Sequence, residues 1–362
     1  MTPDTDMSLQ HHVRAHQIEL AKSLESRKAL YLDIKFWIIL RDVELGLQKD
    51  ALEKELLAEL REKVLHGAVF CPISDTTFGE MLKNADLSRR IAVAALMDEL
   101  SLGVTIIPYN VRVGTELAHF LHSARTPEDV HPLKHLVWSK LSYVMGFVHP
   151  NGTPFKPADE LVMQKMLFEH MWTLSMKEII RLIGDEPLPG LDSFAQLATR
   201  LNDLNSQHAQ ELRSFEQTYK DEVHGVLDVF MDIAINIVSQ MVRTEHGVGH
   251  ELKSKQRAEE GRQLHNLLFA ALGRAETKLA LPTLHIIATI HAAIRWNRQQ
   301  RLKANDFLDF QHATAALGYC DAFFTERSLA SLVAAPHVGL DKTYGCAVVP
   351  SPERALDYLR TV

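Results

Sequence analysis

Cysteine is scarce in this sequence, and its spacing excludes two ways of holding a fold together. Cys71, Cys320 and Cys346 are the three cysteines among 362 residues, and none belongs to a CxxC pair. An odd number of distant cysteines supports neither a disulfide framework nor a zinc knuckle. A reducing cytoplasm is therefore the expected location.

An excess of positive charge is also missing. The formal net charge is -7, so the chain as a whole cannot hold nucleic acid by its overall field. A polyanionic substrate would need a local basic lining or bridging cations. Hydrophobic residues make up 46% and charged residues 23%, which is typical of a folded globular protein and excludes extended disorder.

Secretory and membrane signals are lacking as well. The opening residues, MTPDTDMSLQHH, have neither the basic end nor the apolar run of a signal peptide. The most apolar helical stretch, LALPTLHIIATIHAAIRW, is interrupted by histidine and short for a membrane span, so no membrane partner is expected. The 19 histidines form no HExxH or similar pair, which favours surface or buried structural roles.

Short apolar segments are what the sequence does contain. Runs rich in Val, Ile, Phe or Tyr predict strands at 29–33, 68–72, 104–108, 321–325 and 346–350. None alternates strictly, which is typical of parallel strands covered on both faces. Helical patterns separate them, at 50–66, 75–100, 112–124, 304–318 and 351–361. Strand and helix in alternation predict a doubly wound α/β sheet.

The strand signals are divided into two groups. Between residues 112 and 303 the sequence shows helix after helix and no convincing strand. We therefore expect a leading helix in 1–27, a first α/β part in 28–111, an all-helical insertion in 112–303 and a second α/β part in 304–362. The two α/β parts are expected to share one parallel sheet.

Carboxylates lie beside the expected carboxyl ends of these strands. Asp33 ends the first strand, Glu80 follows the second, Asp306 and Asp309 open the helix before the fourth, and Glu326 follows the fourth. Each has an ordinary alternative as a helix cap, a dipole partner or an exposed helix residue. Together, such carboxylates would repel unless protons or cations relieved them. Oxygen ligands without cysteine or paired histidine favour Mg²⁺ or Mn²⁺. 

The order of these motifs resembles the PIN domain, a family of metal-dependent nucleases. The resemblance is carried by LYLD, ISDTTFGE, DFQHATAALGYCDAFFTE and CAVVPSPERALDYL, and it covers residues 28–111 and 304–361. It implies an α/β fold with a PIN-like parallel sheet flanked by helices and split by the all-helical insertion. It also implies a Mg/Mn-dependent endonuclease that hydrolyses phosphodiester bonds, more often in RNA than in DNA.

The resemblance also implies roles for individual residues. Asp33, Glu80 and Asp309 match the acidic metal-binding positions of the family, and Asp306 would be an auxiliary metal ligand. Glu326 stands where the family usually has Asp or Asn, and completes the catalytic set. Asp321, at the other end of the same strand, is expected to be structural.

Basic residues precede the acidic helix. RWNRQQRLK supplies Arg295, Arg298, Arg301 and Lys303, which could contact a nucleic-acid backbone from one helix face or form a solvated surface. A second cluster consists of Lys253, Lys255 and Arg257.

Other functions stay open at this level. The chain could be a catalytically inert PIN-derived module that binds nucleic acid or protein through its helical insertion, which could equally bind a second copy. A toxin-type effector gated by a partner is a third reading. The Arg-spacer-His pattern of helical nucleases is matched loosely by RTPEDVH and RTEHGVGH.

Overall fold

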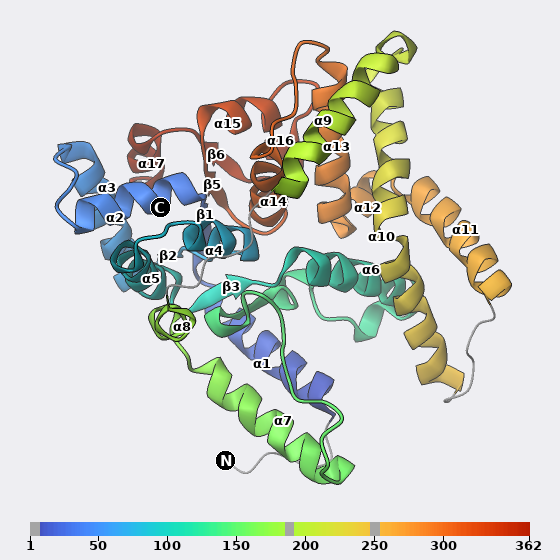
Figure 1. Ribbon diagram of the computed structural model, residues 1–362, viewed down its shortest axis with the longest axis horizontal. Helices are drawn as coiled ribbons and strands as arrows, with labels where there is room; N and C mark the ends of the chain where they lie inside the picture. Colours follow the sequence, from blue (N-terminus) through green and yellow to red (C-terminus); the bar gives the residue numbers. More distant parts are fainter. Residues whose placement is uncertain (1–7, 185–191, 247–253) are drawn as a thin grey trace.

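A small parallel sheet lies among many helices (Figure 1). The computed structural model describes residues 8–184, 192–246 and 254–362. Within these ranges the chain is mostly helical, and a four-stranded sheet has the order β2-β1-β5-β6. Its strands are β1 (Lys28–Leu32), β2 (Val69–Phe70), β5 (Ala322–Phe324) and β6 (Ala347–Val349). All neighbours in this sheet are parallel, so the predicted parallel α/β sheet is present.

Two distant segments of the chain meet at the centre of this sheet. β1 pairs with β5 in a register that runs from Leu30 opposite Ala322 to Leu32 opposite Phe324. Asp321 extends the pairing, because its Oδ2 accepts a hydrogen bond from the Ala29 amide at 2.8 Å, across 292 residues. The expected structural role of Asp321 is confirmed.

The strand predicted at 104–108 lies outside the four-stranded sheet. β3 (Val104–Ile106) pairs antiparallel with β4 (Trp138–Lys140), and a single parallel bridge joins Thr105 to Ile73 after β2. The prediction that 112–303 is entirely helical is therefore wrong at β4. This strand satisfies the backbone of β3, which would otherwise be buried without partners. Three residues are too few for a periodic pattern to reveal.

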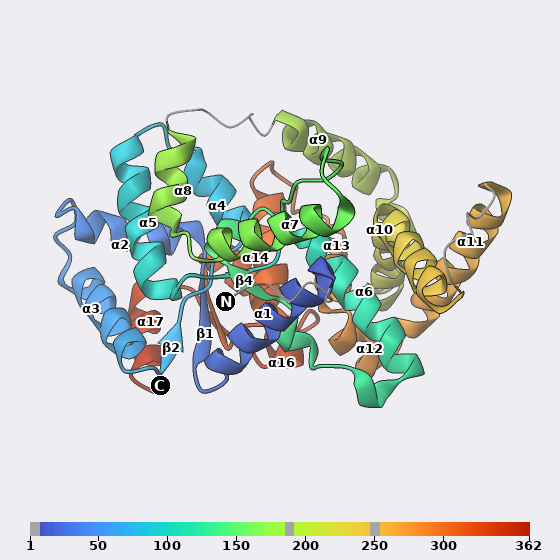
Figure 2. The same ribbon diagram turned by 90° about the horizontal axis from the view of Figure 1, so that it is seen from below.

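Alternate residues of β1 face two separate cores. Leu30 and Leu32 pack into one, and Ala29 and Tyr31 into the other, as the two-residue period of a strand requires. The helices on the first face are α2 (Ile34–Glu44), α3 (Ala51–Leu65), α5 (Leu87–Ser101) and α17 (Pro352–Leu359). Those on the second face are α1 (Leu9–Leu24), α13 (Pro282–Trp296), α14 (Asp306–Leu317), α15 (Arg327–Val333) and α16 (Leu340–Tyr344). Helices thus cover both faces of the sheet (Figure 2).

The helix predicted over 75–100 is two helices. α4 (Asp75–Leu82) ends before α5, and Asp86 caps the start of α5 by accepting bonds from two amides. The helical tract after residue 192 is interrupted between α9 and α10. The remaining helices are α6 (Tyr109–Arg125), α7 (Pro157–Trp172), α8 (Met176–Ile183), α9 (Asp192–Gln207), α10 (Phe215–His246), α11 (Ser254–Ala271) and α12 (Ala275–Ala280).

The helices between residues 112 and 303 pack in two different places. α8 joins the first core through Met176 and Ile180, and Asp98 of α5 accepts hydrogen bonds from the Met176 and Lys177 amides. α6, α10, α11 and α13 instead build a third core around residues such as Phe230. Figure 1 shows α10 and α11 at the side of the molecule away from β1 and β2.

One described helix segment, Phe215–Arg243 within α10, is long and apolar enough to cross a membrane. Only 28% of its most apolar window is buried in the molecule. One such helix is a weak indication, since core helices of soluble proteins pass the same test. The sequence argument had singled out a different stretch, now α12 and α13, and that stretch is mostly buried.

Replacement of Ile180 tests whether α8 belongs to the sheet's core. Ile180 is fully buried, so Ile180→Ala should lower the free energy of unfolding by about 2–5 kcal/mol through the lost contacts and the cavity left behind. The measurement is the midpoint of urea denaturation. Leu182→Ala on the same helix, where the side chain is 78% exposed, is the matched control and should change stability by less than about 0.5 kcal/mol. Equal effects of the two variants would contradict the packing.

Candidate active site

Asp33 lies at the carboxyl end of β1, at the start of α2. Its Oδ1 accepts hydrogen bonds from the Lys35 and Phe36 amides at 3.0 and 3.3 Å, so it does cap the helix. Both bonds use Oδ1, which leaves Oδ2 uncommitted to the cap. The side chain is 6% exposed, and burial raises the pKa of this carboxyl. The cap and the site position are therefore compatible.

The end of β5 lies beside Asp33. The Asp33 amide donates to the Phe324 carbonyl at 3.0 Å, and the Thr325 amide donates to Val349. The buried Thr325 hydroxyl lies near the Asp33 carboxylate and lowers its pKa, although their geometry falls short of a hydrogen bond. Glu326 follows at the first position before α15, and its Oε1 accepts a bond from the Ser328 hydroxyl at 3.0 Å.

His312 connects the other elements of the site. It lies on α14 one turn after Asp309, and its Nε2 is 2.7 Å from Glu80 Oε2 on α4. Because a carboxylate only accepts hydrogen bonds, Nε2 carries the proton. The His312 Nδ1 is 2.7 Å from the Tyr31 hydroxyl on β1. A single buried imidazole thus ties β1, α4 and α14 together.

Tyr31 adds two further contacts to this network. Its hydroxyl oxygen lies 2.6 Å from Ser74 Oγ, the cap of α4, and 3.0 Å from Thr77 Oγ1. Sequence analysis missed both Tyr31 and His312. The signals were present: a tyrosine in an otherwise apolar strand, and a histidine three residues after Asp309, hence on the same helix face.

The charges of the predicted acidic residues act on one another. The pKa of Asp309 is raised to about 7, first by burial and then by the nearby charges of Glu326, Glu80 and Asp306, while His312 lowers it. His312 also lowers the pKa of Asp33. Four of the carboxylates, those of Asp309, Glu326, Glu80 and Asp306, therefore act on one another, and Asp33 is joined to them through the shared influence of His312. Among the described residues, no three of these carboxylates bring ligand atoms within 4.8 Å of one another, so a shared Mg²⁺ or Mn²⁺ would require the side chains to move closer together.

Asp306 also fixes the loop that precedes α14. Its Oδ2 accepts a hydrogen bond from the Lys303 amide at 2.9 Å. The cap position itself is Asn305, whose side chain makes no cap bond. Asp306 therefore holds the preceding loop while its charge still reaches Asp309.

The four predicted nucleic-acid contacts do not share one helix face. α13 ends at Trp296, so Arg298, Arg301 and Lys303 lie in the exposed connection before α14, and the expectation of a common helix face is wrong. Arg295 remains on α13, where its Nη1 pairs with Glu222 at 3.0 Å. In the second cluster, Lys253 and the side chain of Lys255 lie outside the described residues.

The connection that carries these cations is fixed to α9. Asn202 Nδ2 donates to the Leu302 carbonyl at 2.9 Å, and the Leu302 amide donates back to Asn202 Oδ1 at 2.8 Å. Next to it, Phe194 stacks on Phe307 of α14 with ring centres 5.5 Å apart. Arg301 and Lys303 are therefore held on either side of an anchored Leu302, a few residues before Asp306.

Three other exposed cations are close in sequence to the acids. Lys35 begins α2, Arg327 follows Glu326, and Lys83 ends α4 with its Nζ 3.7 Å from Glu80 Oε1. Sequence analysis did not single them out, because isolated lysines and arginines are common on helix ends. Their place after the carboxyl ends of β1, β2 and β5 is visible only once the sheet order is known.

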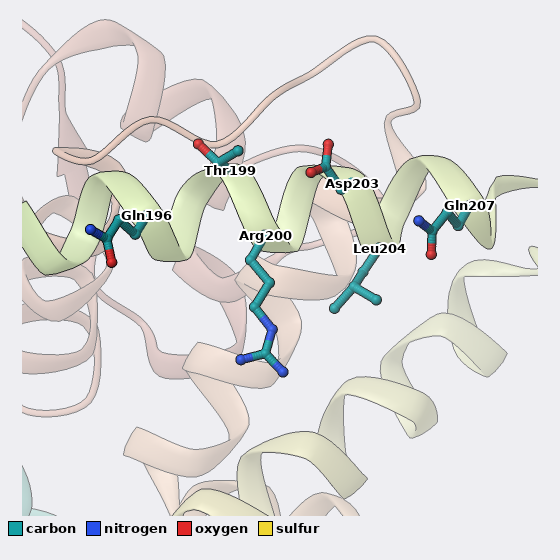
Figure 3. A pocket seen from close by; sticks show the side chains of 6 residues that line it. All are labelled: Gln196, Thr199, Arg200, Asp203, Leu204 and Gln207. Carbon is teal, nitrogen blue, oxygen red and sulfur yellow. The ribbon is translucent and has the colours of Figure 1, made fainter.

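A surface pocket of about 490 Å³ lies elsewhere (Figure 3). All its lining residues come from α9, and Figure 3 shows Arg200 and Leu204 on the same side of that helix. The lining contains none of the predicted acids. A hollow beside a single helix does not assemble groups from several elements, so it does not define a chemical site by itself.

The pH dependence of stability tests the environment of Asp309. Its pKa is about 7 in the fold against an ordinary 3.8, so folding takes up a proton between these values. The free energy of unfolding should therefore fall as pH rises from about 4 to about 7. In metal-free protein, the advantage of Asp309→Asn over the parent should grow from pH 5 to pH 8. The gain is on the order of 1 kcal/mol, reduced by solvent screening of the partly open side chain.

Chemical denaturation at several pH values measures this difference. Asp203→Asn, an exposed aspartate on α9, is the control and should show no such trend. A constant difference between Asp309→Asn and the parent from pH 5 to pH 8 would contradict the crowding of the carboxylates.

Removal of the Tyr31 hydroxyl tests the network around His312. Tyr31→Phe leaves His312, Ser74 and Thr77 short of a buried partner, so the free energy of unfolding should fall by about 1–3 kcal/mol. Tyr358→Phe is the control, because that hydroxyl bonds to no described residue. Denaturant titration compares the two variants, and an equally small loss in both would refute a network centred on Tyr31.

Comparisons with protein-family models, with curated proteins and with solved structures find no match for this chain. Its fold therefore carries no functional assignment by kinship. Function has to be inferred from the chemistry of the site.

Proposed function

We propose that this chain is a PIN-like, metal-dependent endonuclease that hydrolyses phosphodiester bonds in RNA. The observation that supports the proposal is that one buried histidine, His312, influences the charge of both Asp33 and Asp309. These two acids come from the two α/β segments, and they reach the same edge only because β1 pairs with β5. Ligand sites in parallel sheets lie at this carboxyl edge.

The donor set fits a hard divalent cation. Asp33, Glu80, Asp309 and Asp306 would hold Mg²⁺ or Mn²⁺ through carboxylate oxygens. The raised pKa of Asp309 supports this, since a cation would relieve the same repulsion that a proton relieves in the metal-free protein. The buried Thr325 hydroxyl, which has no hydrogen-bond partner and influences Asp33, would supply one more oxygen.

The side chains divide the work of hydrolysis. A bound Mg²⁺ or Mn²⁺ would lower the pKa of water and stabilise the departing oxygen. The helix cap fixes Asp33, and the hydrogen bond from His312 orients Glu80. Glu326, with one oxygen held by Ser328, is placed to accept a proton from attacking water. 

Phosphate is positioned by the surrounding cations in this proposal. Lys35, Lys83 and Arg327 are exposed at the acidic edge, and Arg301 and Lys303 are exposed in the loop that leads to it. They provide the local positive charge that a chain of net charge -7 requires for a polyanion. The preference for RNA rests on the PIN resemblance, because most proteins of that kind act on RNA. A cytoplasmic location and a partner or second copy on the helical insertion belong to the same proposal.

A catalytically inert binding module is the second candidate. Two contacts favour it: the Glu80 carboxylate already accepts a hydrogen bond from the His312 imidazole at 2.7 Å and pairs with the Lys83 ammonium at 3.7 Å. A carboxylate neutralised in this way has less need of a metal ion. Glu326, where the PIN pattern usually has Asp or Asn, points in the same direction.

Substitution of the central acids separates the two candidates. Asp33→Asn and Asp309→Asn should each lower Mn²⁺-dependent cleavage of RNA by at least about 100-fold, since even partners outside the metal ligands are worth 10–100-fold. Cleavage of labelled single-stranded and structured RNA is the assay, with DNA of the same sequence for comparison. Asp203→Asn on exposed α9 should cleave at the parent rate.

Calorimetric titration with Mn²⁺ completes the test. The nuclease should bind Mn²⁺ in the parent and lose that binding in Asp33→Asn. Undiminished cleavage in both asparagine variants would refute the nuclease. A parent chain that binds RNA but neither binds Mn²⁺ nor cleaves would establish the inert module instead.

A further inference from the structure

Two histidines on α1 face a glutamate on α7, far from the acidic edge in sequence. His12 and His16 are one helical turn apart, and Glu169 lies opposite them. One ligand atom of each side chain lies within 4.8 Å of the others. Glu169 Oε1 is 2.8 Å from His12 Nε2 and 3.0 Å from His16 Nε2. Most of the 19 histidines are scattered, whereas His12 and His16 are four residues apart and offer paired ligand atoms.

The position of protons around His16 is decisive. Its Nδ1 lies 3.1 Å from the backbone carbonyl oxygen of His12, and a carbonyl only accepts, so Nδ1 carries a proton. In the neutral ring Nε2 is then a bare lone pair. That lone pair faces Glu169 Oε1, which is also an acceptor. Two acceptors at 3.0 Å need a cation between them, either a second proton on the imidazole or a metal ion.

Aromatic side chains orient the two imidazole rings. Phe168 lies edge-on to both histidines, at 5.4 and 5.1 Å between ring centres, and Trp172 lies edge-on to His16 at 5.4 Å. Neutral imidazole is the form that binds metal.

We propose that His12, His16 and Glu169 bind one Zn²⁺ ion that joins α1 to α7. Imidazole nitrogen with one carboxylate suits Zn²⁺ rather than Mg²⁺. Bonds of about 2.0–2.2 Å in tetrahedral geometry place ligand atoms about 3.3 Å apart. The two separations from Glu169 are 2.8 and 3.0 Å, and the two histidine ligand atoms lie within 4.8 Å of each other, so side-chain rotations that bring the imidazoles together would admit the ion. Three protein ligands leave a fourth position for water.

The consequence is a clamp between two parts of the chain. α1 precedes the sheet and α7 lies in the long helical region, and the two helices are in contact (Figure 2). A metal ion bound only by the folded arrangement would stabilise that contact. The ligands differ in type and location from the carboxylates near Asp33, so the site does not depend on nuclease activity.

The test is Zn²⁺ binding by the full chain after treatment with EDTA and removal of the chelator. Calorimetry is performed with excess Mg²⁺ present, which competes for carboxylate sites. We expect one Zn²⁺ per chain and a rise in the thermal unfolding midpoint. His16→Ala and Glu169→Gln should each weaken the affinity at least about tenfold and remove the rise. Glu169→Gln changes a half-exposed, isosteric side chain and keeps the test valid if His16→Ala fails to fold.

His11→Ala and His170→Ala are the matched controls, because these exposed histidines neighbour the proposed ligands on the same two helices. Both should bind Zn²⁺ like the parent. With Co²⁺ in place of Zn²⁺, the parent should show the visible absorption of a four-coordinate site, and Glu169→Gln should not. No Zn²⁺ binding by the parent, undiminished affinity in Glu169→Gln, or loss of the site in Asp33→Asn instead would each overturn the proposal.

Discussion

The parallel pairing of β1 with β5 is the interaction on which the rest of the structure depends. It sets the end of one apolar segment, Leu30 to Leu32, beside the end of another near residue 324. Side chains that follow the two strands then share one edge of the sheet. Asp33 and Glu326 are brought there directly, and α14 delivers Asp309 because it leads into β5. The chemistry proposed for this edge has no other structural origin.

A polar network stabilises that edge from within. Tyr31 and His312 are buried, and between them they contact groups on β1, α4 and α14. Buried polar groups are costly unless they are paired, so the network requires these elements to keep their relative positions. The network also fixes the positions of two acids. Glu80 is hydrogen-bonded to His312, and Asp309 lies one helical turn from His312 on α14. The positions of the Glu80 and Asp309 carboxylates thus depend on the packing of the core that contains Tyr31.

Much of the sheet could be predicted from the sequence, because its strands are compact apolar runs of β-forming residues bounded by Pro, Gly or Asp. Each of the five segments contains an observed strand. β4 was not predicted, because Trp138–Lys140 is too short to show a two-residue period and is a strand only through its pairing with β3. The break between α4 and α5 escaped too, as its signal, the Asp86 cap, is local and lies inside a continuing helical pattern.

The candidate acids could be proposed from the sequence because each lies beside the end of a predicted strand. Asp33, Glu80, Asp306, Asp309 and Glu326 were proposed from their positions beside strand ends, and the charges of Glu326, Glu80 and Asp306 do act on Asp309. His312 was not found, because its role comes from contacts with Tyr31 and Glu80 that are distant in sequence. Arg295 was misplaced for the same reason, since its partner Glu222 lies on another helix.

The contact between Ala29 of β1 and Asp321 beside β5 joins residues that are 292 positions apart. This separation also determines when the sheet can finish folding. During synthesis, β1 leaves the ribosome long before β5 has been made. The side of β1 that pairs with β5 therefore stays without its partner while the intervening helices form. Closing so long a loop is slow and leaves an unpaired, apolar strand exposed to other chains. The same delay keeps the two halves of the acidic cluster apart in any nascent or prematurely ended chain.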